Sequence, residues 1–288
     1  MADTDAIWMY NPSFALAIVG TVVYGIIFVL ISYQTLVKYR AWYFTVVPIG
    51  ATVEVVAYIL RSYSVKNPTE LTPFVMTLTL TVLAPIFIAA GNYLLISRLI
   101  LSVLPLSSHR ILKIPGRRLT PIFVICDVIA FLIQGAGSSI ASADEWQGDG
   151  ERIGRRILIG GLVFQLIAFS LFLCVLGRFH LLGNRWAMED APQGWQMVVR
   201  AVYISSSLIV IRCIYRASEF AEGMNGYAFR TEWPFWVFEA LPMIGAIGIF
   251  CIYHPSRYLG QQGARRKTPG SYDNVELSGV SASTTETV

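Results

Sequence analysis

Ionisable side chains recur at helical spacing inside stretches of the chain that are otherwise apolar. Two sets occupy positions i, i+4 and i+7, namely Glu54, Tyr58 and Arg61, and Arg212, Arg216 and Glu219. Residues at this spacing share one face of a helix, so each set forms a polar stripe. A charge at the centre of a bilayer costs roughly 2.5–3.5 kcal/mol on insertion scales, so such residues turn toward a protein partner or a water-filled cavity. The stripes therefore predict charge pairing inside a membrane protein.

Further polar residues stand in other apolar stretches, and the formal charges nearly balance. Four carboxyl groups face three guanidinium groups if Asp127 and Glu239 are counted with the stripes, and Arg216 with Glu219 is the best local pair. We expect the set to line a polar cavity as a substrate or coupling site, with purely structural ion pairs as the alternative. The full candidate set is Glu54, Tyr58, Arg61, Asn92, Asp127, Gln134, Arg212, Arg216, Glu219 and Glu239.

Several chemistries lack the residues that they need. His109, His180 and His254 lie in different segments, at or beyond the ends of apolar stretches, so they cannot assemble a zinc site within the membrane. The sequence has neither a phosphate-binding glycine loop with a lysine nor a nucleophile elbow. Residues 233–254 contain no lysine for a retinal Schiff base. We therefore expect neither an enzyme nor a bound cofactor or metal.

The elements that must position these residues are transmembrane helices. The chain has 288 residues, of which 55% are hydrophobic and 14% charged, which is too apolar for a soluble domain of this length. Roughly 20 apolar residues cross a bilayer as a helix, and no ten-residue alternation typical of a barrel is present. We predict an all-α bundle of seven helices, at about 14–36, 42–63, 74–97, 119–143, 157–177, 201–220 and 233–254.

The basic residues predict the orientation of this bundle. With the N-terminus outside, 14 of the 22 lysines and arginines fall on the cytosolic side and six outside. Residues 1–13 then form an extracellular N-terminus, and the polar stretch 259–288 forms a disordered cytosolic tail. The net charge of +4 is explained by this loop bias, so no nucleic-acid partner is expected. Anionic lipid headgroups are the expected partners of one basic cytosolic loop, through Arg110, Lys113, Arg117 and Arg118.

The sixth and seventh stretches carry a combination of residues that resembles a known family. The run Arg212-x3-Arg216-x2-Glu219-x3-Gly223, followed by Phe238-Glu239 and His254-Pro255, resembles the signature of the fungal RTA-like family of lipid-translocating exporters. Glu54-x3-Tyr58-x2-Arg61, Leu83-Ala84-Pro85, and Asp127 ahead of Gln134 extend the match, which covers about Gly50 to Arg257. Ala57, Trp236 and Ser256 depart from the family's usual residues.

The resemblance implies a function as well as a fold. Members of the family are seven-helix fungal membrane proteins associated with resistance to toxic amphiphiles, such as aminated sterols and sphingoid bases, and one branch is associated with porphyrin uptake. We therefore expect an exporter or translocase of amphiphilic lipids in the plasma membrane of a fungus. A receptor or stress sensor that acts on resistance indirectly is the alternative, and porphyrin or haem transport is a weaker one. The substrate, the energy source and the oligomeric state stay open.

Overall fold

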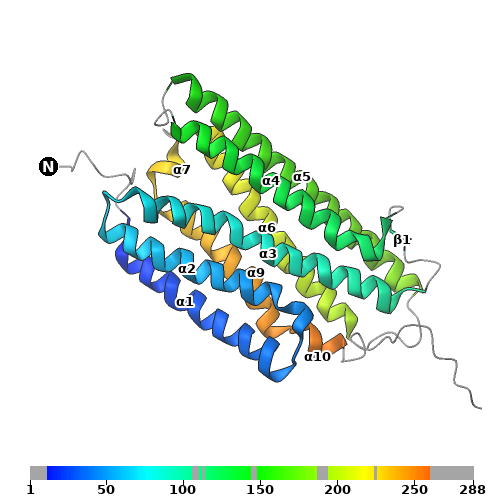
Figure 1. The fold of residues 1–288 in the computed structure, drawn as a ribbon. Helices are drawn as coiled ribbons and strands as arrows, with labels where there is room; N and C mark the ends of the chain where they lie inside the picture. The colour runs from blue at the N-terminus through cyan, green and yellow to red at the C-terminus, as the bar shows by residue number, and fades with distance from the viewer. Residues whose placement is uncertain are drawn as a thin grey trace, which may run out of the picture.

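The computed structural model describes residues 12–105, 110–111, 114–143, 148–186, 194–223 and 226–259, and these form a bundle of long helices (Figure 1). Seven segments are long and apolar enough to cross a membrane, which confirms the predicted all-α fold. The first six are α1 (Phe14–Ser32) with η1 (Tyr33–Lys38), α2 (Val46–Lys66), α3 (Leu71–Val103), α4 (Gly116–Ala143), α5 (Gly148–Trp186) and α6 (Trp195–Glu222). The seventh joins α8 (Trp233–Phe235), η4 (Trp236–Ala240) and α9 (Leu241–Ile252).

Short elements connect or follow the long helices. They are η2 (Trp42–Phe44), α7 (Tyr227–Arg230), α10 (Pro255–Leu259), and the antiparallel pair β1 (Arg110–Ile111) and β2 (Ile114–Pro115). The pair β1–β2 falls in the loop for which lipid contact is predicted. Within that loop Arg117 and Arg118 are exposed at the start of α4, whereas Lys113 and the side chain of Arg110 lie outside the described residues. The contact with anionic lipid stays a prediction.

The fifth helix differs most from its predicted length. It was expected at 157–177, between flanking arginines, but α5 runs from Gly148 to Trp186. Arginine is a good helix former, so charged residues end an apolar stretch without ending the helix. The first turn of α5 is acidic and the last turn is basic, which is the favourable arrangement for the helix dipole. The helix therefore continues beyond the hydrocarbon core.

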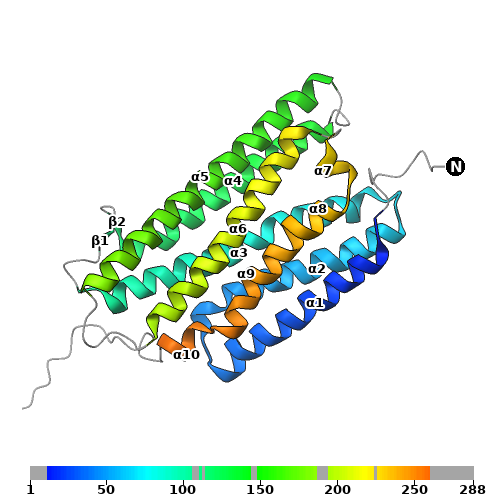
Figure 2. The same ribbon diagram turned by 180° about the vertical axis from the view of Figure 1, so that it is seen from behind.

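The helices are arranged with two pairs at the edges and three helices between them. The pair α4 and α5 forms one edge, the pair α1 and α2 forms the opposite edge, and α3, α6 and α9 lie between (Figures 1 and 2). The chain enters α1 at one end of the bundle and reaches α10 at the other, as an odd number of crossings requires. Residues 1–11 and 260–288 lie outside the described residues. The side of the membrane that each end faces stays a prediction.

The bundle exposes large apolar side chains and buries a set of charged ones, the reverse of a soluble protein. Large apolar side chains such as Val29, Leu132 and Leu171 are exposed on the outer surface. All ten candidate site residues are buried. This distribution fits a bilayer as the solvent, because hydrocarbon accepts apolar surface and penalises charge.

Candidate functional site

Four charged residues form a buried cluster between α6 and η4, which we call the ion-pair cluster: Arg212, Arg216, Glu219 and Glu239. Arg212 Nη2 lies 3.0 Å from Glu239 Oε1, and Arg216 Nη1 lies 2.7 Å from Glu219 Oε2. Arg216 Nε is 3.4 Å from the second carboxyl oxygen of Glu239, so Glu239 faces both arginines. The local pair expected from the spacing of Arg216 and Glu219 is confirmed. Pairing of this kind is what makes buried charge tolerable.

A proline in α3 supplies a further partner for the cluster. Pro85 has no N–H and cannot bond the carbonyl four residues earlier, which belongs to Thr81. Arg212 donates from Nη2 to this carbonyl oxygen at 2.7 Å. The guanidinium thus satisfies a backbone acceptor that the proline leaves free, and a buried carbonyl without a partner would be costly. Pro85 therefore links the third helix to the charges of the sixth.

Glu239 reaches both arginines from an unusual stretch of the seventh span. It lies in η4, a π-helix of five residues, and Pro242 follows in the first turn of α9. A π-helical turn holds an extra residue, which shifts the face on which later side chains lie, and such turns are frequent at functional sites. The hydroxyl of Tyr24 in α1 donates to the carbonyl oxygen of Ala240 at 2.8 Å. Helical periodicity in the sequence gives no sign of this turn.

Glu54 lies beside the ion-pair cluster without joining a pair. It is 1% exposed, and neither carboxyl oxygen has a hydrogen-bond partner in the described part of the chain. Its charge interacts with those of Arg212 and Glu239. Tyr58, one turn further along α2, stacks on Tyr24 with ring centroids 4.6 Å apart. The expected pairing of the buried charges is therefore incomplete at Glu54.

Arg61 belongs to a second charged site, at the end of the bundle where α1 begins. Its guanidinium lies 3.7 Å from Glu232 and 4.0 Å from the centre of the Phe235 ring. Glu232 also accepts hydrogen bonds from the backbone N–H of Ser13 at 2.9 Å and from the indole N–H of Trp236 at 3.0 Å. It thereby ties the first, second and seventh spans together. Sequence reasoning missed this role because Glu232 stands just outside an apolar stretch.

The other candidate residues make separate contacts between helices. Tyr93 donates to Asp127 Oδ2 at 2.8 Å, so the carboxyl of Asp127 has a hydroxyl partner but no ion-pair partner among the described residues. Asn92 donates to the hydroxyls of Ser205 and Ser206 at 3.1 and 3.3 Å. Gln134 donates to Gln165 at 3.0 Å, between α4 and α5. The expectation of near-complete ion pairing is thus wrong for Asp127 as well, and these residues lie apart from the ion-pair cluster.

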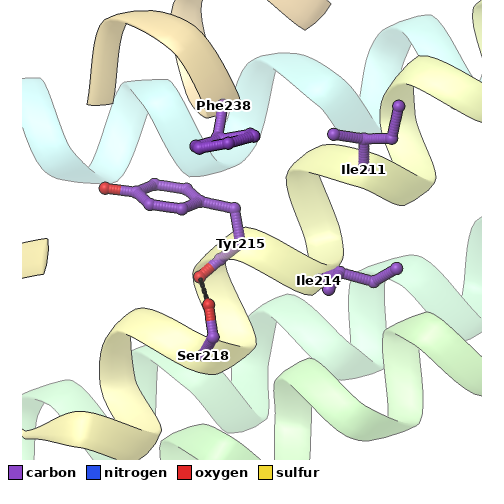
Figure 3. Close-up of a pocket in the computed structure, with 5 residues that line it drawn as sticks. All are labelled: Ile211, Ile214, Tyr215, Ser218 and Phe238. Atoms are coloured by element: carbon purple, nitrogen blue, oxygen red, sulfur yellow. Dashed lines mark hydrogen bonds between the residues drawn. The ribbon is translucent and has the colours of Figure 1, made fainter. Parts of the chain in front are cut away.

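An apolar groove opens on the outer surface next to the ion-pair cluster (Figure 3). It has a volume of about 290 Å³ and is lined by Ile211, Ile214, Tyr215, Ser218 and Phe238. Its walls come from α6 and η4, and the rings of Tyr215 and Phe238 stack with centroids 5.8 Å apart. Both isoleucines are about half exposed. The groove therefore faces the position of lipid tails, and the sequence analysis did not predict it.

Tyr215 connects this groove to the ion-pair cluster. Its ring lines the groove, and its hydroxyl donates to Glu219 Oε1 at 3.3 Å. Glu219 in turn holds Arg216 through its other oxygen. Three residues thus lead from a lipid-facing apolar surface to buried charge. Just beyond them α6 ends at Gly223, which has a φ of +76°, in the region where glycine is favoured over any residue with a side chain.

His254 holds the opposite end of the seventh span and has no free nitrogen. The backbone N–H of Ser256 donates to Nδ1 at 3.3 Å, so Nδ1 carries no proton. Nε2 is then the protonated nitrogen and donates to the hydroxyl of Thr35 at 3.2 Å. The ring also stacks on Tyr39 with centroids 4.7 Å apart. His254 is therefore a helix-terminal anchor whose ring nitrogens are both occupied.

Comparison with known proteins identifies the family to which this arrangement belongs. Residues 47–262 match the family model described as RTA1 like protein. The chain belongs to this family. It is 31% identical to Protoporphyrin uptake protein 1 of Saccharomyces cerevisiae, over 88% of this chain and 94% of that protein. No solved structure is significantly similar to the chain.

Two further relatives in the RTA1 like family carry names that refer to lipids. The chain is 30% identical to Probable lipid transporter atnI of Emericella nidulans, over 88% of this chain and 68% of that protein. It is 24% identical to Sphingoid long-chain base transporter RSB1 of Saccharomyces cerevisiae, over 92% of this chain and 78% of that protein. These relatives are fungal and are named as transporters. Together with the seven apolar helices, they identify an integral, multi-pass membrane protein of a fungal family.

Proposed function

We propose that this protein moves amphiphilic lipids with a cationic head across the bilayer, as an exporter or translocase. The observation that carries the proposal is the direct connection, through Tyr215, from the lipid-facing groove to the ion-pair cluster. The names of two relatives, a lipid transporter and a sphingoid long-chain base transporter, support the same class of substrate. An exporter of this kind in the plasma membrane would protect the cell against toxic amphiphiles.

The two parts of such a substrate pose different problems for a protein in a membrane. A lipid tail loses little when it moves from the bilayer onto an apolar helix surface, because lipid tails and leucine side chains are similarly apolar. The groove between α6 and η4 offers a surface of this kind. The charged head cannot enter hydrocarbon at comparable cost. The head is therefore the part for which the protein must provide a path.

The ion-pair cluster provides partners for a cationic head. An ammonium group that reaches Glu219 replaces one guanidinium N–H donor by another donor of the same charge, so the carboxylate stays paired throughout. Arg216 keeps a second acidic neighbour in Glu239, at 3.4 Å, while Glu219 holds the substrate. Each charged group thus keeps a neighbour of opposite charge during the exchange, although the bound cation adds one positive charge to the ion-pair cluster.

Protection of cells against a sphingoid base tests the proposal. We expect Glu219→Gln and Arg216→Ala each to abolish protection while the protein still reaches the cell surface. Arg200→Ala is the matched control, because Arg200 lies on the same helix but is exposed. Full protection by both cluster variants would contradict the proposal.

A receptor or stress sensor would give the same growth phenotype, so transport must be measured without other proteins. Purified protein in proteoliposomes should move a fluorescent sphingoid base faster than empty vesicles do. We expect Glu219→Gln to reduce this rate and Arg200→Ala to leave it unchanged. A rate equal to that of empty vesicles, despite protection in cells, would favour the sensor.

Tetrapyrrole transport is a second candidate, favoured by the 31% identity to Protoporphyrin uptake protein 1. His254 does not support it as a ligand, since both ring nitrogens are occupied. A porphyrin would instead present carboxylates, whose natural partners are Arg212 and Arg216. Uptake of protoporphyrin should then fail in Arg216→Ala but survive in Glu219→Gln. A sphingoid base, in contrast, should not be moved by either Arg216→Ala or Glu219→Gln. The two variants therefore distinguish a cationic substrate from a porphyrin.

A further inference from the structure

Glu54 differs from the other buried carboxyl groups of the candidate set. Glu219 and Glu239 each accept a hydrogen bond from an arginine, and Asp127 accepts one from a tyrosine hydroxyl. Glu54 is equally buried, yet both of its oxygens lack a hydrogen-bond partner in the part of the chain that the structure describes. An ionised carboxylate in apolar surroundings without a donor is the costly state of this group. A proton on Glu54 removes that cost.

The charges that face Glu54 lead to the same conclusion. Two tyrosines, Tyr24 from α1 and Tyr58 from its own helix, interact electrostatically with it. Two charged groups also interact electrostatically with it, Arg212 from α6 and Glu239 from η4. The ion-pair cluster holds two arginines and two glutamates and is therefore neutral. An ionised Glu54 leaves one uncompensated negative charge, which either a proton or one monovalent cation can neutralise.

We propose that Glu54 is a proton-binding site, at which one proton is exchanged for one cationic headgroup. The inference rests on the proposed function and adds its energy source. With Glu54 protonated, the ion-pair cluster is neutral and empty of substrate. When a monovalent ammonium group joins the cluster, the proton leaves Glu54, and the total charge stays the same. A proton gradient across the membrane then drives the amphiphile in the opposite direction.

Binding of a cation with a fixed charge measures this exchange. The full-length protein in phospholipid nanodiscs is titrated with a long-chain quaternary ammonium amphiphile, whose own charge does not change with pH. We expect about one proton to be released for each cation bound, and affinity to weaken about tenfold per pH unit below the pKa of Glu54. Glu54→Gln resembles the protonated form, so it should bind only as weakly as the wild type does at low pH, without proton release and with no dependence on pH. Unchanged proton release in Glu54→Gln would overturn the proposal.

Infrared spectroscopy tests the site without relying on transport. A protonated carboxylic acid has a carbonyl stretch that a carboxylate lacks, and this band should disappear from the wild-type spectrum in Glu54→Gln. Glu70→Gln is the matched control, because Glu70 is exposed at the start of α3 and should leave the band unchanged. Asp127→Asn should also leave the Glu54 band in place. Absence of a band that depends on Glu54, at any pH at which the protein is folded, would overturn the proposal.

The two measurements separate this inference from the proposed function. If the Glu54 band is present but the amphiphile neither binds nor moves, the proton site stands and the proposed substrate is wrong. If the amphiphile moves in proteoliposomes without a Glu54 band and without proton release, the proposed function stands and the role of Glu54 is wrong. If Glu54→Gln does not fold, absence of proton release on cation binding to the wild-type protein would still overturn the proposal.

Discussion

Two helix contacts in the same bundle differ in kind: α4 and α5 pack closely at glycines, whereas α6 and η4 meet through charged side chains. In the first, Gly137 and Gly154 bring the backbones together, and a Cβ atom on either would lie 2.5 Å from a backbone nitrogen of the other helix. The polar contact there, Gln134 with Gln165, is neutral. In the second, the helices meet through buried ion pairs and leave an apolar groove at the surface. Both solutions are available in a membrane, where close packing and polar contacts replace the hydrophobic effect.

The difference shows which part of the bundle can change its contacts. Backbone contact between helices is lost as soon as they separate, so the close packing of Gly137 and Gly154 favours keeping α4 and α5 together. An ion pair can exchange one partner for another of the same charge without separating the helices. The region that can accept a charged substrate is thus the one that holds replaceable partners, at the α6–η4 junction.

The largest expected effect comes from breaking this junction at Arg212. Arg212→Ala removes the partner of Glu239 and of the Thr81 carbonyl at once. Removing one member of a buried pair costs about 3–5 kcal/mol, so we expect the folded yield and the midpoint of thermal unfolding in detergent to fall sharply. Arg200→Ala, on the exposed face of the same helix, should change stability by less than about 0.5 kcal/mol. Equal stability of the two variants would contradict the role of Arg212.

The α4–α5 contact is tested by two glycines that are two residues apart. A Cβ atom on Gly137 would clash with the backbone of α5, whereas one on Gly135 would meet nothing within 4 Å. Gly137→Ala should therefore destabilise the protein by about 1–3 kcal/mol. Gly135→Ala should stabilise it by up to about 1 kcal/mol, because alanine favours the helix. Unfolding in detergent measures both, and the same sign of effect for the two variants would count against close packing.

A smaller and more selective effect is expected from filling the groove. Ile214→Trp places a large side chain in the groove, which is open to the surface, so the fold should be retained. Ile204→Trp is the control, because Ile204 is similarly exposed on α6 but does not line the groove. We expect Ile214→Trp to slow movement of a long-chain amphiphile about tenfold, which corresponds to about 1.4 kcal/mol. Equal rates for the two variants would show that the amphiphile does not pass through the groove.

The sequence alone predicts the seven helices and the ion pair between residues of one helix. Apolar length predicts the spans, and the spacing of Arg216 and Glu219 predicts a pair that the structure contains at 2.7 Å. Contacts between helices depend on how each helix is rotated, which spacing does not reveal. For this reason the partner of Arg212 was not assigned, and Arg61 pairs with Glu232 instead of a residue from the candidate set.

Three features of the site left no readable signal in the sequence. The π-helix around Glu239 lies just before Pro242, and a search for regular periodicity does not detect it. The groove lies between α6 and the following span, and its shape depends on how these two spans pack together. The sequence shows that Pro85 leaves a backbone carbonyl without its helical partner. It does not show that Arg212, on another helix, donates to this carbonyl. Each depends on how separate helices meet in space.

We propose that the ion-pair cluster recognises a cationic head while the groove accepts the tail. A comparison of a charged with an uncharged substrate tests this directly. Proteoliposomes that contain only this protein are given a sphingoid base and, separately, its N-acetylated form, which has the same tail but no charge. We expect the protein to accelerate movement of the cationic form well above the rate in empty vesicles and to leave the acetylated form near that rate. Glu219→Gln should lose this difference. Equal acceleration of both forms, or a difference that survives in Glu219→Gln, would contradict this proposal.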